Sequence, residues 1–552
     1  MASLLLAPSA HAAKAYPAPV TLRQADGQLI TVMLHGDEHC HWVTTPDGTL
    51  LTLHDGIYRQ ATADEREQLS ALRMAPRHEP VQVSGTLFPH TGTPRALVLL
   101  ADFQDRSFMH DDATTQQIFD LYLNQAEGKP THEADASLSR NEGSVRKYFS
   151  DMSGGLFVPQ FDVTAPVHLS GKMADYGSGK GDNMSRFIPE VCDLAHAAGV
   201  DFSQYDANDD GYVDLVYVIY AGWGESTGGP SESIWPKSGV VSGGTYDGKR
   251  VARYGVHSEL CMNETVWQTP RINGIGLFCH EFSHCLGLPD FYPTSTAAQD
   301  ARNPSMEYFD VMDNGEYVQN GYVPVAYTAW EREAMGWLQI DTLSESRLVE
   351  LRSLDATERP GQAYRIMNPA DATGHEYLIV QNLQQEGWNR RLSQALGVHG
   401  MLVTHVDYDA SAFALGINSV NNTIGHSRMT FIPAGGGYVS GYDVKTPDMQ
   451  NAYYAFHAAS VFPGSEAVSQ LNSIAWYTGV SDQQQLLNIQ ESDDGTVSFA
   501  YVNDGSSAVT VISDTSRRDD AQLYDLQGRR VSRNRAHAGL YVSQGRKRIV
   551  KD

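Results

Sequence analysis

The sequence predicts a multidomain protein whose largest domain mixes α-helices and β-strands, an α/β (α+β) fold, with β-rich segments before and after it. The chain has 552 residues, which is too many for one compact hydrophobic core. Between residues 91 and 340, buried strands and amphipathic helices follow one another. On both sides, short alternating runs separated by turns are typical of β-structure. We therefore expect one large α/β domain between smaller β-rich ones.

The composition is that of a folded and strongly acidic protein. Hydrophobic residues make up 41% of the chain and charged residues 19%, so there is enough apolar material to bury several cores. The formal net charge of -26 repels phosphate-rich partners, so we expect no nucleic acid among its partners. No apolar run is long enough to span a bilayer, so we also expect no integral membrane segment.

The N-terminus and the cysteines bear on the compartment. Leu4 to Leu6 are apolar, and Ala10, His11 and Ala12 fit the small-residue pattern of a signal-peptide cleavage site. Residues 1–12 are therefore interpreted as the remnant of a signal peptide, which predicts secretion. The 5 cysteines are odd in number and too few for a disulfide framework, although one or two bridges remain open.

Residues 13–90 are predicted to form a small β-rich unit. Alternating stretches at 28–34 and 49–53 are flanked by Asp-Gly pairs, which favour hairpins. A polar connector is expected over residues 61–80.

Residues 91–340 carry the clearest helix and strand patterns. The run RALVLLADF (95–103) predicts a first buried strand, and LVYVIYA (215–221) predicts a second one. Helices are expected over 143–152, ended by the glycines at 154 and 155, and over 187–198. A further helix is predicted over 275–286, where apolar residues recur at three- and four-residue steps and Gly287 follows.

After residue 340 the pattern changes to short strands and turns. Residues 341–503 are predicted to be a β-rich domain. Residues 504–552 are predicted to be a separate small module with paired strands.

A cluster of metal-binding side chains lies on the predicted 275–286 helix and just after it. His280 and His284 are four residues apart, so both imidazoles lie on one helix face and can bind one ion. Gly287 allows a sharp turn that can bring Asp290 back as a third ligand. Three protein ligands leave one position of tetrahedral zinc open for water, as in catalytic sites. Zn²⁺ is therefore the predicted cofactor.

Glu281 is the predicted catalytic residue. It follows His280 directly and is better suited to accept a proton from zinc-bound water than to bind the ion. Zinc lowers the pKa of such water to about 7, so a nearby carboxylate can complete its deprotonation and later protonate the leaving amine. The pattern H-E-x-x-H-x-x-G-x-x-D thus predicts peptide hydrolysis without a covalent intermediate. A buried helix with hydrogen-bonded histidines is the structural alternative.

This pattern resembles that of the metzincin metallopeptidases. The string HEFSHCLGLPDFY is similar to the immune inhibitor A-like family in particular, in which aspartate replaces the third histidine of most metzincins. Further segments that resemble this family are SVRKYFSDMSGGLF (144–157), DANDDGYVDLVYVIYAGWGES (206–226), FDVMDNGEY (309–317) and HGMLVTHVDY (399–408). The resemblance implies a metzincin-like zinc peptidase domain at residues 91–340 in a secreted or cell-surface bacterial protein.

The same resemblance implies roles for other residues. Met312 fits the methionine that lies in a tight turn beneath the zinc of metzincins. Asn314 stands where some relatives have a substrate-binding tyrosine, and Tyr317 is a weaker candidate for that role. Residues 13–90 resemble a propeptide, in which Cys40 is either a zinc-blocking thiolate or an ordinary core residue. A second resemblance concerns residues 504–552, where YDLQGRRV (524–531) and AGLYVSQGRKRIVKD (538–552) are similar to the sorting domains of type IX secretion, with the secretion machinery as partner. A small β-module with a basic face is the alternative.

An acidic loop predicts a second metal site. Its spacing D-x-N-x-D-G-x-x-D places oxygen ligands on alternate residues around a glycine, as in a calcium loop. The expected Ca²⁺ ligands are Asp206, Asn208, Asp210, Tyr212 and Asp214. Tyr217 stands where an EF-hand has its bidentate glutamate, so an ordinary Asp/Asn/Gly turn is the alternative.

We therefore expect a secreted proenzyme of a zinc-dependent endopeptidase that hydrolyses protein or peptide substrates. One competing function is a catalytically silent, calcium-dependent binding protein or adhesin on a peptidase scaffold. The intact set of His280, Glu281, His284 and Asp290 argues against it. A zinc amidase or deaminase acting on small substrates is the other, and it would need a closed pocket.

Overall fold

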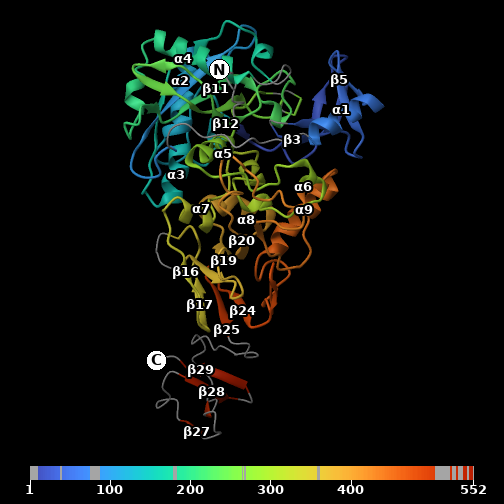
Figure 1. The fold of residues 1–552 in the computed structure, drawn as a ribbon, viewed down its shortest axis with the longest axis vertical. Helices are drawn as coiled ribbons and strands as arrows, with labels where there is room; N and C mark the ends of the chain where they lie inside the picture. Colours follow the sequence, from blue (N-terminus) through green and yellow to red (C-terminus); the bar gives the residue numbers. More distant parts are fainter. Residues whose placement is uncertain are drawn as a thin grey trace, which may run out of the picture.

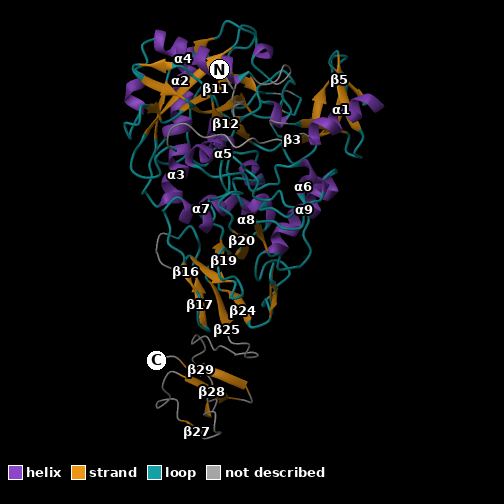
Figure 2. Cartoon of the chain, in the orientation of Figure 1, coloured by secondary structure: helices purple, strands orange, loops and turns teal. Residues whose placement is uncertain are grey.

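The computed structural model describes residues 10–37, 40–74, 87–177, 183–263, 265–266, 269–356 and 361–503, together with short strands of the C-terminal module. The molecule is elongated, with a large α/β body at one end and a small N-terminal sheet beside it (Figure 1). Helices gather in the α/β body and at its junction with the next region, whereas strands dominate beyond that junction (Figure 2). The predicted mixture of an α/β fold with β-rich regions is confirmed.

A seven-stranded sheet forms the centre of the α/β body. Its strand order is β1-β12-β15-β11-β7-β8, and β9 also pairs with β7. The strands are β1 (Ala10–Ala12), β7 (Arg95–Asp102), β8 (Gln160–Val163), β9 (Val167–His168), β11 (Val216–Trp223), β12 (Lys237–Val240) and β15 (Arg253–Leu260). From β15 to β8 the neighbours are parallel, whereas β12 and then β1 are added antiparallel at one edge. The strands predicted at 95–103 and 215–221 are confirmed as β7 and β11.

Helices cover both faces of this sheet because its central strands are apolar on both sides. Val98 and Leu100 of β7 pack in one core with α2 (Asp112–Asn124), α3 (Val145–Ser153) and α5 (Ile275–Leu286). Leu97 and Leu99 point to the opposite core, which is closed by α4 (Met184–Ala197). The predicted helices at 143–152 and 275–286 are confirmed, and α4 begins about one turn before the predicted start at 187.

The N-terminal unit is an antiparallel five-stranded sheet in sequence order. Its strands are β2 (Val20–Arg23), β3 (Leu29–Gly36), β4 (His41–Thr44), β5 (Leu50–His54) and β6 (Ile57–Gln60). The predicted hairpins are therefore confirmed. The expected polar connector was wrong in part, because residues 63–74 form α1 (Ala63–Met74). Its strong helix formers lack an apolar stripe clear enough to be recognised as a helix.

Two sheets enclose a separate core between residues 341 and 503. One contains β16 (Asp341–Thr342), β18 (Ala363–Met367), β19 (Glu376–Leu383), β20 (Gly400–Asp407) and β21 (Met429–Phe431). The other contains β17 (Arg347–Leu351), β24 (Gln484–Glu491) and β25 (Val497–Asn503). Leu378 and Val380 of the first sheet pack against Leu351 and Phe499 of the second. Two helices, α8 (Arg390–Leu396) and α9 (Pro447–Ser460), interrupt this β-rich region and were not predicted.

The remaining elements are short. They are β10 (Tyr212–Val213), β13 (Thr245–Tyr246), β14 (Lys249–Val251), α6 (Thr296–Asp300), α7 (Ala329–Ala334), β22 (Ile474–Trp476) and β23 (Gly479–Ser481). The C-terminal module contributes β26 (Leu523–Tyr524), β27 (Arg530–Val531), β28 (Gly539–Ser543) and β29 (Arg546–Val550), which form one four-stranded sheet. In the part of the chain that is described, no helix combines the length and the apolar character needed to cross a bilayer.

Candidate metal centre

The helix α5 carries the candidate site. One of its faces packs against the central sheet, and another carries His280 and His284. Phe278 stacks on Tyr217 of β11 with a ring distance of 4.0 Å, which fixes the helix against the sheet. The helix ends at Gly287, whose φ of 107° few other residues adopt, and whose N–H donates to the carbonyls of Ser283 and His284. The chain therefore turns sharply and returns past the helix face that carries the two histidines.

This turn brings three predicted ligands together. The Nε2 atoms of His280 and His284 each lie 3.3 Å from Oδ1 of Asp290. All three side chains are buried, and their ligand atoms lie within 4.8 Å of one another. Within the described ranges, no other group of three His, Cys, Asp or Glu side chains meets in this way.

The surroundings of the histidines fit a metal ion. His280 donates from Nδ1 to the carbonyl of Val311 at 2.8 Å, and His284 from Nδ1 to the carbonyl of Leu288 at 2.7 Å. These bonds turn both Nε2 atoms toward Asp290, the usual arrangement around metal-bound histidines. Nε2 of His280 and Oδ1 of Asp290 are buried without a hydrogen bond, which a cation between them would relieve.

The charges agree with metal ligation. Burial lowers the pKa of His280, which favours the neutral imidazole that binds metals. Burial acts to raise the pKa of Asp290, but His284 and His280 outweigh it and hold that pKa below its ordinary value. Asp290 therefore supplies a negative charge and His280 a neutral nitrogen.

Asp290 is positioned by a residue that sequence reasoning missed. Asn418 donates from Nδ2 to Oδ2 of Asp290 at 2.6 Å, and its Oδ1 accepts the N–H of Asp290 at 2.8 Å. Asn418 lies 128 positions further along the chain, beyond the α/β body. No local motif links the two residues, and only the asparagine-rich string NSVNN (418–422) marks the segment.

The turn around Met312 lies directly against the ligands. The N–H of Met312 donates to Oδ1 of Asp310 at 2.8 Å, and its carbonyl accepts the N–H of Phe291 at 2.9 Å. The residue before it, Val311, holds His280. Met312 is fully buried, and its proposed place beneath a zinc ion stays a prediction.

The N-terminal segment covers the centre. The N–H of Ala13 donates to Oε1 of Glu281 at 2.8 Å, and the carbonyl of Ala13 accepts the indole N–H of Trp235 at 2.8 Å. Just before Ala13, β1 pairs with the edge strand β12. Tyr317, the weaker tyrosine candidate, donates from its hydroxyl to the carbonyl of Lys14 at 2.6 Å.

Cys40 does not take part in this contact. It is buried in the N-terminal unit, where its N–H donates to Oδ1 of Asp37 at 3.2 Å, and it is absent from the group of potential ligands. Its neighbour His39 lies outside the described residues. The hypothesis of a blocking thiolate is therefore replaced by the backbone contact of Ala13. All five cysteines lie in the described ranges, and none of them forms a disulfide.

The acidic loop keeps its oxygen-rich character but pairs with a lysine. Asp206 accepts the N–H groups of Asp210 and Gly211, and its Oδ2 lies 2.7 Å from Nζ of Lys249. Asp214 accepts the N–H of Ala207, and burial raises its pKa to about 6. Asn208 and Tyr212 lie in the same loop. Calcium binding here stays a prediction.

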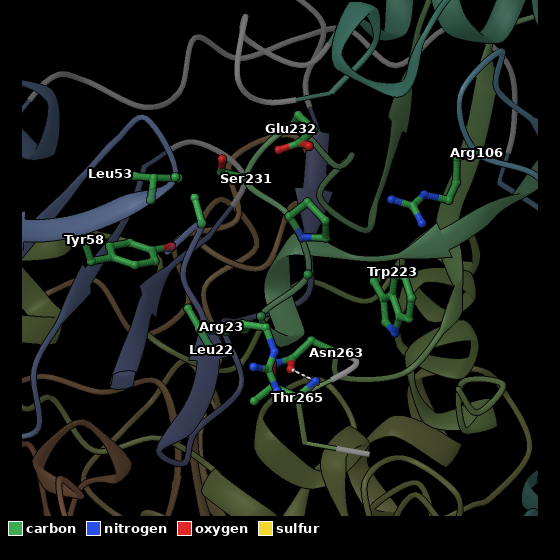
Figure 3. Close-up of a pocket in the computed structure, with 15 residues that line it drawn as sticks. Leu22, Arg23, Leu53, Tyr58, Arg106, Trp223, Ser231, Glu232, Asn263 and Thr265 are labelled. Atoms are coloured by element: carbon green, nitrogen blue, oxygen red, sulfur yellow. Dashed lines mark hydrogen bonds between the residues drawn. The ribbon is translucent and has the colours of Figure 1, made fainter. Parts of the chain in front are cut away.

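A separate pocket lies where the N-terminal sheet meets the α/β body (Figure 3). Leu22, Arg23 and Tyr58 line it from the sheet, and Arg106 and Trp223 line it from the body. It contains none of the three candidate metal ligands, so it is not part of the metal centre.

Comparisons with known proteins agree with the site. Residues 88–340 match the family described as immune inhibitor A peptidase M6, catalytic domain. Immune inhibitor A of Bacillus thuringiensis subsp. alesti is 24% identical over 280 residues, which are 43% of this chain and 39% of that protein. Pre-pro-metalloprotease PrtV of Vibrio cholerae serotype O1 (strain M66-2) is 24% identical over 310 residues, 46% of this chain and 32% of that protein.

The chain thus matches well under half the length of these relatives. The matched residues 88–340 nevertheless contain the whole set of His280, Glu281, His284, Asp290 and Met312. Residues 88–340 thus resemble the catalytic domain of the immune inhibitor A-like metallopeptidases.

Proposed function

We propose that the chain is the proenzyme of a secreted zinc-dependent endopeptidase that cleaves protein substrates. One observation carries this proposal: an extended peptide segment crosses the centre, and its amide nitrogen lies 2.8 Å from Oε1 of Glu281. A carboxylate at that distance can pass a proton to the nitrogen of a peptide bond as the bond breaks. The three potential ligands on the same helix and turn supply the place for the metal.

His280, His284 and Asp290 would hold the zinc ion. Zinc bound there would polarise the peptide carbonyl and lower the pKa of an attacking water molecule. Glu281 would take the proton from the attacking water and deliver it to the leaving amine. Val311 and Leu288 keep the two imidazoles in the ligating orientation, and Asn418 keeps Asp290 in place.

Latency fits the same geometry. Residues 13–90 would act as a propeptide, because the N–H of Ala13 donates to the carboxylate of Glu281 and the N-terminal sheet follows Ala13 along the chain. A substrate can reach Glu281 only after this segment leaves. A metzincin-like catalytic domain, secretion to the medium or cell surface, a C-terminal sorting role for residues 504–552 and calcium in the 206–214 loop belong to the same proposal. A catalytically silent binding protein is not favoured, because the expected metal ligands and the expected catalytic residue, Glu281, are all present.

Hydrolysis of labelled casein tests the proposal. A site for an unrelated protease is placed within residues 75–86, so that the full chain folds before it is cut. The cut protein, once separated from its N-terminal fragment, should hydrolyse casein, and a zinc chelator should abolish the activity. Glu281→Gln should lower the rate by at least about a hundredfold while zinc stays bound, because general acid–base catalysis contributes this much.

Glu345→Gln, at an exposed position of the β-rich region, is the control and should leave the rate unchanged. The proposal fails if the cut, zinc-loaded protein leaves casein intact, or if Glu281→Gln hydrolyses it at the wild-type rate.

A further inference from the structure

The N-terminal segment lies across the metal centre in the manner of an extended peptide ligand. β1 adds antiparallel to the edge strand β12, with Ala12 opposite Lys237. Beyond it, the carbonyls of Ala13 and Lys14 accept bonds from Trp235 and Tyr317, and the N–H of Tyr16 donates to the carbonyl of Ser226 at 2.9 Å. Main-chain pairing of this kind binds a peptide regardless of its sequence, whereas side-chain pockets select among sequences.

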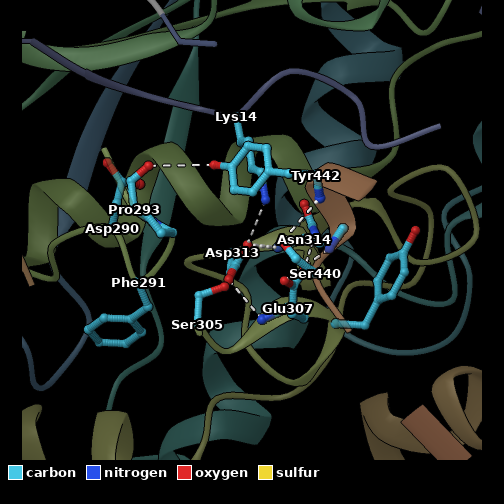
Figure 4. Close-up of polar contacts among 12 residues, drawn as sticks. Lys14, Asp290, Phe291, Pro293, Ser305, Glu307, Asp313, Asn314, Ser440 and Tyr442 are labelled. Atoms are coloured by element: carbon cyan, nitrogen blue, oxygen red, sulfur yellow. Dashed lines mark hydrogen bonds and ion pairs between the residues drawn. The ribbon is translucent and has the colours of Figure 1, made fainter. Parts of the chain in front are cut away.

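The side chain of Lys14 enters such a pocket. Only 4% of Lys14 is exposed, and its Nζ lies 3.4 Å from Oδ1 of Asp313, which is itself fully buried. The ammonium also lies over the ring of Tyr442, 4.2 Å from its centroid, an arrangement that attracts a cation to an aromatic face. Figure 4 shows Lys14 reaching down from the segment toward Asp313 beside Tyr442.

The pocket is built from parts that flank the metal centre. Asp313 follows Met312 directly, and Tyr292 lies two residues after Asp290, with its ring centroid 5.7 Å from Nζ of Lys14. Tyr442 comes from the β-rich region, and its hydroxyl donates to the carbonyl of Pro293 at 3.5 Å. A residue bound here is therefore in fixed register with the peptide bond next to Glu281.

The charge of the pocket calls for a cation. Oδ1 and Oδ2 of Asp313 accept the N–H groups of Asn314 and Glu307, at 2.9 and 2.7 Å, which hold the carboxylate in place. Burial raises the pKa of Asp313 to about 6, and Lys14 opposes this rise. Among the described side chains, Lys14 is the cation that pairs with Asp313. When the segment leaves, a buried carboxylate loses its partner, which is costly until another cation replaces it.

We propose that this pocket gives the endopeptidase a preference for lysine or arginine as the second residue after the bond it cuts. The inference rests on the proposed function. A substrate in the register of the N-terminal segment places its scissile bond where Ala12 joins Ala13, because the nitrogen of that bond contacts Glu281. Its second following residue then lies where Lys14 lies. Lysine suits the pocket better than arginine, since the observed partner is one ammonium group.

Four peptides test the preference. They carry the sequence of residues 9–16, Ser-Ala-His-Ala-Ala-X-Ala-Tyr, with Lys, Arg, Met or Glu as X. They are given to the protein that has been cut within residues 75–86 and separated from its N-terminal fragment. The products are identified by mass spectrometry. The kcat/KM for Lys should exceed that for Met by about tenfold or more, because a hydrogen bond to a charged group contributes about 1.5–3 kcal/mol. Glu should be the poorest substrate.

Asp313→Asn should remove the preference, so that the ratio of kcat/KM for the Lys peptide to that for the Met peptide falls to about one. Asp443→Asn is the matched control, because Asp443 is a neighbouring acid that pairs with Arg302 at 2.6 Å outside the pocket. It should keep the preference for Lys. Should Asp313→Asn not fold, the wild-type peptide series still decides the question.

The outcomes separate the two proposals. If casein and the peptides are cut in a Glu281-dependent manner, but Lys and Met peptides are cut at equal rates or at another bond, the pocket has no selective role and only this inference fails. If neither casein nor any peptide is cut, the proposed function fails and takes this inference with it.

Discussion

At the scale of single residues, the candidate metal centre depends on groups that would not themselves bind the metal. Val311 and Leu288 orient the two histidines through their carbonyls, and Asn418 orients Asp290 through its amide. The amide contacts matter because a carboxylate held at its second oxygen offers only the first to an ion. Loss of such a supporting contact commonly lowers metal affinity, because the ligand is no longer held in the geometry that binds the ion.

Asn418→Gly should therefore weaken zinc binding. Glycine tolerates the φ of 48° at this position, so the substitution removes the amide without straining the backbone. The dissociation constant for zinc should rise about ten- to a hundredfold, the range found for lost outer-shell partners. Competition with a chromogenic chelator at fixed pH measures it.

Asn422→Gly is the control for that measurement. The Oδ1 of Asn422 accepts the N–H of Ser295 at 2.8 Å, so it ties down the same loop without contacting a ligand. Its zinc affinity should stay close to that of the wild type. Equal affinities for the two variants would show that Asn418 has no special role.

The sequence predicts those residues of the candidate site that are close together along the chain, because their spacing on a helix places them near one another. His280, Glu281 and His284 occupy one turn of α5, and a glycine marks the return of Asp290, so local spacing suffices. Asn418 lies 128 positions from Asp290, and Ala13 lies 268 positions from Glu281. Sequence periodicity reflects local structure only, so it cannot predict contacts over such separations. This is also why the sequence suggested Cys40, which lies between His39 and His41, as the blocking group, whereas Ala13 provides the observed contact.

At the scale of elements, a helix or strand is predicted well where two sequence signals mark the same residues, and poorly where there is only one signal. The bounds of α5 agree with the prediction because an apolar stripe and a terminal glycine point to the same residues. The helix α1 was missed because its sequence has no clear apolar stripe. The helix α9 was missed because its buried face carries polar or amphipathic residues such as Gln450, Tyr453 and His457. The long strands β7 and β11 were found because they are apolar on both faces.

Gly287→Ala tests the turn that links α5 to Asp290. At a φ of 107° an added Cβ strains the backbone, and it would lie 2.6 Å from Cδ1 of Leu87. The unfolding free energy should fall by about 1–2 kcal/mol, the order of the cost of left-handed backbone for other residues. Zinc affinity should fall too, because relief of the strain moves Asp290. Thermal denaturation and zinc competition measure the two effects.

Gly128→Ala serves as the matched substitution. Gly128 also has a positive φ, 71°, but an added Cβ there meets nothing within 4 Å. This variant should lose stability and keep its zinc affinity. If Gly287→Ala also kept wild-type zinc affinity, the turn would not set the position of Asp290.

At the scale of the whole molecule, the α/β body and the region after residue 340 share one apolar core. Trp388 meets Tyr148 of α3 with a ring distance of 5.0 Å, and Phe431 meets Phe309 at 4.8 Å. The indole N–H of Trp330 also donates to the hydroxyl of Tyr377 at 3.0 Å. The sequence analysis divided the chain near residue 340, where the family match also ends, yet the packing continues across that position.

A chain that ends at residue 340 should therefore not fold like the longer protein. It would expose Tyr148, Phe309 and Trp330, and burial of each large apolar side chain contributes about 1.5–3 kcal/mol, so a few such losses approach the whole stability of a domain. It would also lack Asn418 beside Asp290. A chain that ends at residue 503 keeps both and should unfold in one cooperative transition and bind zinc as the full chain does. Circular dichroism during heating, with zinc analysis of the soluble protein, compares the two. If the shorter chain unfolds cooperatively and binds zinc as tightly as the longer one, the region after residue 340 is dispensable for the metal centre and the shared core does not govern its folding.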